Sequence, residues 1–298
     1  MASREHLVRA LWTLFEPIHA LTYFSSQSRE SFAAVGLTRY WDGYFAGRSA
    51  PLGAVNDAPV TAIFSGFAPM MAERALPAAW SIASVESVLE ARSLGAAATI
   101  RELFEDEDAV IAAADALTPI AARADTIGRP LAAANQALPL ESDPFRRLWQ
   151  ATATLREHRG DGHVIALVAG DIAGLSTIVL RSALDLDAAT MKKARGWSDE
   201  QWAAEEGQLV GRGLLESDLS LSRKGADALD TAEALTNHLA LGPWQHLDDD
   251  ALREIAGLLL PIALACAPLF GHPNPIGMPE PWDPIADPSA NSVPEIIS

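Results

Sequence analysis

The densest group of chemically capable side chains lies in the segment LREHRGDGHV, residues 155–164. It holds two arginines, two histidines, a glutamate and an aspartate: Arg156, Glu157, His158, Arg159, Asp161 and His163. Two glycines allow a sharp turn, so we predict a loop over 159–162 that brings His158 and His163 together. The pair could serve acid–base chemistry or contribute to a metal or haem site, although the spacing matches no strong metal signature. A salt-bridged loop between two helices is the alternative interpretation.

A further histidine, His19, lies in a mostly apolar stretch close to Tyr23. A histidine in such a place is more often hydrogen-bonded in the core than bound to a metal. Counted from the Leu-Trp pairs at positions 11–12 and 148–149, however, His19 and His158 occupy nearly equivalent places and could face one central cavity. We therefore take His19, His158 and His163 as weak metal candidates, and these three with Tyr23 as candidate ligand-binding residues.

An aromatic stripe follows in the chain. Tyr40, Trp41 and Tyr44 share one face of an expected helix, and Arg48 continues that face one turn later. Aromatic rings can stack on a planar ligand while the guanidinium binds a carboxylate. This pattern adds Trp41, Tyr44 and Arg48 to the candidate site for a small organic ligand. An ordinary core stripe, with Arg48 paired internally, is the alternative.

The bulk composition excludes several classes of function. The chain has 298 residues and a net charge of −17, which repels nucleic acid and anionic lipid. Its one cysteine, Cys266, excludes an intramolecular disulfide. The sequence has no GxSxG, GxGxxG or Walker-type motif for nucleophilic or nucleotide chemistry. With no secretory signal pattern and no uninterrupted apolar run of about 18 residues, we expect a cytoplasmic protein with no membrane partner.

Apolar residues recur at helical spacing along most of the chain, so the elements that position these side chains should be helices. We predict helices over 4–23, 28–35, 37–50, 60–72, 85–104, 106–124, 130–138, 145–158, 163–169, 171–184, 187–195, 198–210, 222–241 and 248–269. The tail from Gly271 onward is rich in proline, which favours an extended chain. Trp282 and Ile285 give that tail apolar side chains with which to pack on the body.

The segment 196–229 has the order of elements found in a winged helix-turn-helix. Ser198 caps a helix, a strand at 213–215 and a strand at 219–221 flank a short turn, and Ser222 caps the next helix. The helix in the position of a DNA-recognition helix carries acidic side chains at Asp199, Glu200, Glu205 and Glu206. Because carboxylates repel phosphates, this charge argues against DNA as a partner.

A weak internal repeat accompanies this segment. Residues 32–51 align without gaps on residues 165–184, with the triplet Arg-Ser-Ala at 48–50 falling on the same triplet at 181–183. Alanine-rich helices give such matches by chance, so a duplication and a chance match remain open. A true duplication would predict two similar halves that pack with pseudo-symmetry.

Residues 197–229 resemble MarR-like winged-helix domains, whose pattern includes a Gly-Leu strand, a wing and a helix start of the kind seen here as Leu221-Ser222-Arg223-Lys224-Gly225. The whole chain also resembles a broad group of uncharacterised actinobacterial helix-turn-helix-type proteins, through GYFAGRSAPLG (43–53) and LREHRGDGHV (155–164). A MarR-like regulator would be a dimer with a basic recognition helix, an arginine at the wing tip and a ligand pocket near the dimer interface. This sequence lacks the basic helix and the wing-tip arginine.

These observations predict a mainly α fold with a helical domain over 1–140, a MarR-like winged-helix domain with a small β-wing over 141–270, and a proline-rich extended tail over 271–298. The function that we expect is capture of a small organic ligand on a winged-helix scaffold, in a homodimer if the resemblance extends so far. A MarR-like DNA-binding regulator and a metal- or haem-dependent enzyme that uses the histidines are the alternatives.

Overall fold

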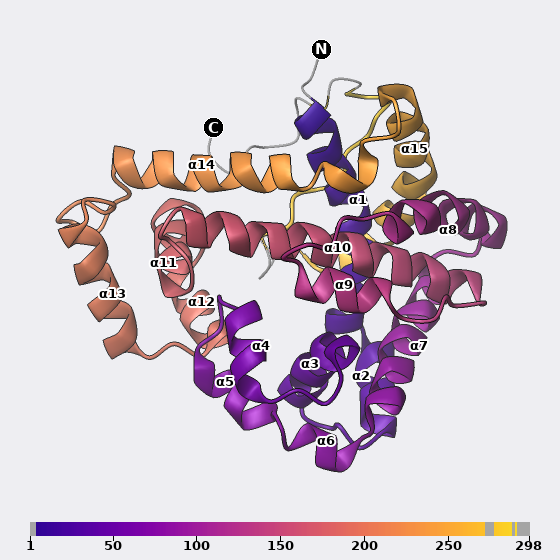
Figure 1. Cartoon of the computed structure of the whole chain (residues 1–298), viewed down its shortest axis with the longest axis horizontal. Helices are drawn as coiled ribbons and strands as arrows, with labels where there is room; N and C mark the ends of the chain where they lie inside the picture. Colours follow the sequence, from indigo (N-terminus) through magenta and orange to yellow (C-terminus); the bar gives the residue numbers. More distant parts are fainter. Residues whose placement is uncertain (1–3, 272–276, 288–289, 291–298) are drawn as a thin grey trace.

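A computed structural model describes residues 4–271, 277–287 and 290, and it consists mainly of helices (Figure 1). The helices are α1 Arg4–Phe24, α2 Ser26–Ala34, α3 Tyr40–Ser49, α4 Asp57–Ile63, α5 Pro69–Ala75, α6 Ala79–Ile82, α7 Val85–Leu103, α8 Glu107–Ala122, α9 Pro130–Gln136, α10 Pro144–Ala169, α11 Leu175–Leu184, α12 Ala188–Arg195, α13 Asp199–Gly211, α14 Arg223–Leu239 and α15 Asp249–Cys266, with 3-10 turns at Ala50–Leu52, Gly242–Trp244 and Ala267–Leu269.

Local side-chain chemistry fixes where many of these helices begin. Ser84, Asp143 and Ser222 each precede a helix and accept a hydrogen bond from a backbone N–H in its first turn, which satisfies a donor that the helix itself leaves free. Ser198 does the same for α13 and forms a reciprocal capping box with Gln201. The caps predicted at Ser198 and Ser222 are thus confirmed.

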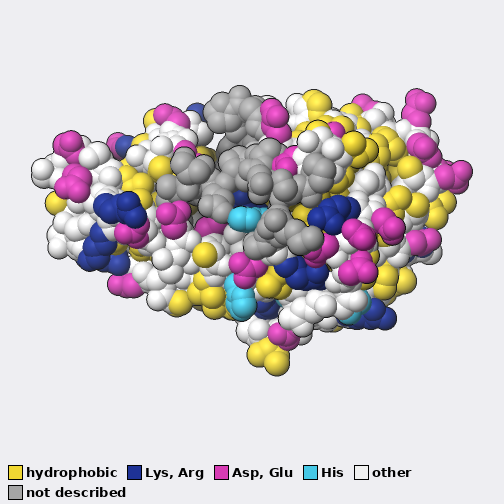
Figure 2. All heavy atoms as spheres, turned by 90° about the horizontal axis from the view of Figure 1, so that it is seen from above, with side chains coloured by type: hydrophobic (Ala, Val, Ile, Leu, Met, Phe, Trp, Pro, Cys, Tyr) yellow, Lys and Arg dark blue, Asp and Glu magenta, His cyan; other side chains and the backbone are white. Residues whose placement is uncertain are grey.

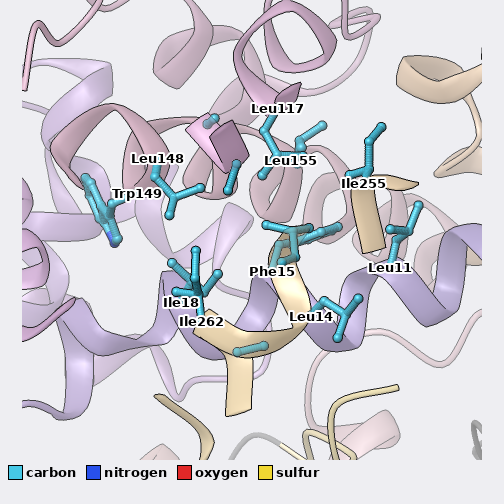
Figure 3. Close-up of a cluster of buried hydrophobic side chains, with 14 of the residues drawn as sticks. Leu11, Leu14, Phe15, Ile18, Leu117, Leu148, Trp149, Leu155, Ile255 and Ile262 are labelled. Carbon is cyan, nitrogen blue, oxygen red and sulfur yellow. The ribbon is translucent and has the colours of Figure 1, made fainter. Parts of the chain in front are cut away.

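Helix α1 runs through the middle of the main core. Its residues Leu11, Leu14, Phe15 and Ile18 are fully or almost fully buried among side chains of α8, α10 and α15 (Figure 3). Removing so much apolar surface from water stabilises the fold, and each large side chain contributes on the order of 2 kcal/mol. This core draws on both sides of the expected boundary at residues 140/141, and the division into domains stays a prediction.

Two smaller apolar clusters hold the parts of the chain that surround the candidate site. One joins α3 to α7 and contains Phe45, Phe64 and Phe67. The other joins α10 to α14 and contains Trp202 and Leu209 of α13. Helix α14 lies along α10 and connects this second cluster to the main core (Figure 1). The candidate site therefore lies between these two clusters and the main core.

Several expected elements differ from the structure. The wing is not formed as a pair of strands: among the described residues the only β pairing is an isolated bridge between Leu215 and Leu221. That bridge and the turn at 216–219 are too short to make a ladder. The expected helix at 60–72 is also interrupted: α4 ends at Ile63, the backbone leaves the helical conformation at Phe64, and Pro69 occupies the first turn of the next helix, α5.

The loop predicted at 159–162 is wrong, since α10 continues without a break from Pro144 to Ala169. Its two glycines lie within the helix rather than making a turn. A β-carbon on Gly162 would lie 2.6 Å from Nη1 of Arg129. A β-carbon on Gly160 would make only ordinary contacts with Arg156 and Glu157, at 3.4 and 3.5 Å, so the close approach is confined to Gly162. The helix gains this close contact at the cost of about 1 kcal/mol in helix propensity.

Helix α15 and one residue of the proline-rich tail pack on the main core. Helix α15 has the length and mean hydropathy of a membrane-spanning helix, but the core helix of a soluble protein passes the same test, and Leu259 and Ile262 are buried against α1. In the tail, Trp282 is buried and its backbone N–H donates to Thr13 Oγ1 at 3.0 Å. Ile285, by contrast, is 87% exposed, so the expectation that it anchors the tail is wrong.

The two segments of the expected repeat share their secondary structure. Residues 32–51 contain the end of α2, a turn and α3, and residues 165–184 contain the end of α10, a turn and α11. The preceding parts differ, since α1 and α2 are separated at Ser25 whereas α10 is continuous. Duplication remains a prediction.

Candidate functional site

Helix α10 distributes the polar cluster around its axis instead of gathering it. At about 100° per residue, His158 and His163 lie about 140° apart around the helix. His158 faces Gly242, whereas Nδ1 of His163 shares a hydrogen bond with Thr236 Oγ1 at 3.0 Å. Arg159 faces α14. The two imidazoles therefore do not form one acid–base or metal site.

One face of α10 opens on a cavity of about 460 Å³. Arg156, Gly160, His163 and Leu167 line it and recur at the spacing of a single helical face. The other walls come from α1, α3, the segment 63–67, α11 and α12. A volume of this size is in the range of about 300–1,000 Å³ that small-molecule sites occupy.

Five of the sequence-derived candidates line this cavity: Tyr23, Trp41, Tyr44, Arg48 and His163. The other two, His19 and His158, do not line it. His19 lies behind the wall, where its Nε2 shares a hydrogen bond with the Tyr23 hydroxyl at 3.0 Å and its ring stacks on Trp149. These contacts give His19 a packing role behind Tyr23.

His158 is 1% exposed, and its Nε2 has no hydrogen-bond partner among the described residues. Burial, followed by the nearby Arg129 guanidinium, lowers the pKa of His158 to about 4. Burial likewise lowers the pKa of His163 to about 4 and holds that of His19 well below its ordinary value. All three imidazoles are therefore neutral at neutral pH.

This neutrality predicts a pH dependence of stability. Between pH 6.5 and pH 4 the unfolded chain binds a proton at His158 that the folded chain does not, so His158 destabilises the fold as pH falls. When the pH is lowered from 7 to 5, wild type should lose stability through His158 and the variant His158→Gln should not. The free energy of unfolding of the variant, measured against that of wild type, should therefore rise by about 1–2 kcal/mol. Urea unfolding at both pH values measures this. A difference that does not change with pH would contradict the neutral, buried imidazole.

A buried ion network forms the floor of the cavity. The Glu157 carboxylate accepts two hydrogen bonds from Arg48, from Nε at 2.9 Å and from Nη2 at 3.0 Å. It accepts a third from Nη1 of Arg156 at 3.0 Å. Arg156 also pairs with Glu16. Although burial opposes ionisation, the two guanidinium groups hold the pKa of Glu157 far below its usual range. Arg48 lines the cavity as predicted, but it also has the internal pairing that was the alternative interpretation, through its two hydrogen bonds to Glu157.

Aromatic rings form the adjoining wall. Trp41 and Tyr44 of the predicted stripe pack against Phe67, with ring centroids 5.8 and 5.4 Å from it. The guanidinium of Arg48 lies over the ring of Phe64, 4.1 Å from its centroid. Such a wall offers ring faces and edges to a planar apolar molecule.

Sequence reasoning missed several residues of the cavity. Phe64 and Phe67 lie in the non-helical segment that the sequence predicts as part of a continuous helix, and Arg181 and Arg195 come from α11 and α12. Arg181 donates two hydrogen bonds to Asp185 one turn along its own helix. No local signal marks Arg195, because Lys192, Lys193 and Arg195 all lie in the last turn of α12.

Within residues 4–271, 277–287 and 290, no group of three or more His, Cys, Asp or Glu side chains is placed to hold a metal ion. The weak metal candidates His19, His158 and His163 have the separate neighbours described above.

A short turn, 196–198, connects α12 to α13, and the small β bridge and α14 follow α13. No curated protein and no solved structure matches the chain. A family model described as a helix-turn-helix family matches residues 8–269, which is nearly the whole chain. The chain therefore belongs to this helix-turn-helix family.

Proposed function

We propose that this protein binds a small organic molecule in the cavity of about 460 Å³ between α10 and the aromatic wall. The observation that carries the proposal is the convergence of Trp41, Tyr44 and Phe67 with buried guanidinium groups around one open volume. Apolar walls with a few polar groups are typical of small-molecule sites.

The position of the cavity supports a ligand-responsive role. The backbone N–H of Ala68 donates to the carbonyl of Arg195 at 2.9 Å, and Trp197 Nε1 donates to the carbonyl of Gly66 at 3.0 Å. Gly66, Arg195 and their neighbours thus join the cavity wall to the junction between α12 and α13. A ligand that alters this wall would act directly on the orientation of α13.

A neutral apolar dye tests the proposed function. N-phenyl-1-naphthylamine, which fluoresces in apolar surroundings, should bind wild-type protein saturably with one site per chain. Ala194→Trp fills the cavity from α12 and should weaken this binding about tenfold or more. Ala189→Trp, on the exposed side of the same helix, is the matched control and should leave the affinity unchanged. Equal affinity of both variants and wild type would place the dye elsewhere and contradict the proposal.

A DNA-binding regulator is the second candidate, because membership of a helix-turn-helix family favours it. The surface of α13 argues the other way. Asp199 and Glu200 are exposed, while Glu205 and Glu206 accept hydrogen bonds from Ser176 and Trp202. On the face drawn in Figure 2, basic side chains form small groups between acidic ones rather than one continuous stripe. Phosphate binding needs such a stripe.

Fluorescence anisotropy with labelled duplex DNA from upstream of the protein's own coding sequence separates the two candidates. With a net charge of −17, we expect binding weaker than about 1 µM even at low salt. Tight binding that weakens steeply with added salt would instead establish DNA as a partner. Adding the ligand in that case would show whether the cavity controls DNA binding.

A further inference from the structure

The cavity contains a guanidinium without a balancing carboxylate. Among the arginines that line it, Arg48 and Arg156 share Glu157, and Arg181 pairs with Asp185. Arg195 has no carboxylate partner among the described residues, and its buried Nε has no hydrogen-bond partner there. An unpaired buried cation is costly, because water that would solvate it has been removed.

The surroundings of Arg195 are aromatic and cationic. Its guanidinium lies over the ring of Phe67, 4.3 Å from the centroid. Burial lowers the pKa of Arg195, and the charges of Arg48 and Arg156 lower it further, while the Tyr44 hydroxyl favours the charged form. A negative group that entered the cavity would therefore meet an excess of positive charge next to ring surfaces.

We propose that the ligand is a planar aromatic organic anion and that its carboxylate, sulfonate or phosphate group pairs with Arg195. This inference rests on the proposed function of the cavity and names the chemistry of its ligand. The guanidinium offers several N–H donors in one plane, which match the oxygens of such an anion. The rings of Trp41, Tyr44 and Phe67 would contact the planar body of the ligand.

The net charge of the whole protein is opposite in sign to the local charge of the cavity. A charge of −17 attracts cations and repels anions over long range. A preference for an anion would then come from the local charge of the cavity, and not from the field of the whole molecule. Arg195 supplies that local charge at the junction of α12 and α13.

Two dyes that differ by one sulfonate test the inference. 1-Anilinonaphthalene-8-sulfonate is the anionic counterpart of N-phenyl-1-naphthylamine, and both are titrated fluorimetrically into wild-type protein, Arg195→Gln and Arg223→Gln. The wild type should bind the sulfonate about tenfold more tightly than the neutral dye. Arg195→Gln should lose this preference and keep its affinity for the neutral dye. Arg223→Gln, which removes an exposed arginine outside the cavity that pairs with Asp227, should keep the preference.

Each outcome is decisive for one claim. If the wild type binds the neutral dye as tightly as the sulfonate, the anion inference fails while the proposed binding function stands. If neither dye binds, the proposed function itself fails. If both arginine variants lose the preference equally, Arg195 is not the pairing group. Circular dichroism of Arg195→Gln provides the folding check, and the fold should persist because the change removes a half-buried charge that has no carboxylate partner among the described residues.

Discussion

Glu157→Gln should lower the free energy of unfolding at pH 7 by about 3–5 kcal/mol, because it leaves Arg48 and Arg156, whose side chains are 11% and 21% exposed, without their shared buried carboxylate. Glu157 is 2% exposed and joins Arg48 of α3 to Arg156 of α10. The variant keeps the volume of the side chain, so the loss reports charge rather than packing. Denaturant unfolding followed by circular dichroism measures it.

The effect of Glu157→Gln has a pH signature. Glu157 has a pKa far below its usual range, so the stability it contributes is fully present above the pKa of an unfolded glutamate, 4.5. The difference between wild type and variant should shrink as pH falls through the folded pKa. Asp115→Asn is the matched control, because Asp115 is 63% exposed beside Arg147 and should change stability by less than about 1 kcal/mol. Equal losses in the two variants would contradict the buried network.

Glu233→Gln should have a comparable effect at a second place, again about 3–5 kcal/mol. The Glu233 carboxylate accepts hydrogen bonds from Arg9 Nε at 2.9 Å and from Arg159 Nη2 at 2.7 Å. All three residues are less than a tenth exposed. Glu233 thereby joins α14, which follows the helix-turn-helix segment, to α1 and α10. Unfolding monitored by tryptophan fluorescence would measure the loss, since Arg159 lies over the ring of Trp12.

The control for this second variant lies on the same helix. Asp227 pairs with Arg223, whose side chain is 89% exposed, so Asp227→Asn should cost less than about 1 kcal/mol. If Glu233→Gln were no more destabilising than Asp227→Asn, the buried carboxylate would not hold α14 to the core. A strong loss confined to Glu233→Gln would confirm that the same helix carries one structural ion pair and one surface pair.

Parts of this structure could be predicted from the sequence where a local rule governs them. Ser198 and Ser222 mark helix starts because a cap acts within three residues of itself. Trp41, Tyr44 and Arg48 were placed on one face because helical spacing alone decides it. The cavity residues on these faces therefore followed from periodicity.

Other parts depend on contacts between distant segments. The glycine at 162 looks like a turn signal, and only the approach of Arg129 explains why a continuous helix needs it. Arg195 could not be distinguished from other arginines until tertiary packing showed which of them lack carboxylates. The wing is smaller than the sequence predicts, because the strand-like residues at 213–221 form a single bridge, between Leu215 and Leu221.

The most direct test of the account is a crystal structure of the protein with N-phenyl-1-naphthylamine bound. We predict density for the dye inside the cavity, against Trp41, Tyr44 and Phe67 and beside α10. Density for the dye only outside this cavity, or a cavity closed by these side chains in the presence of saturating dye, would contradict the assignment of the cavity as a ligand site.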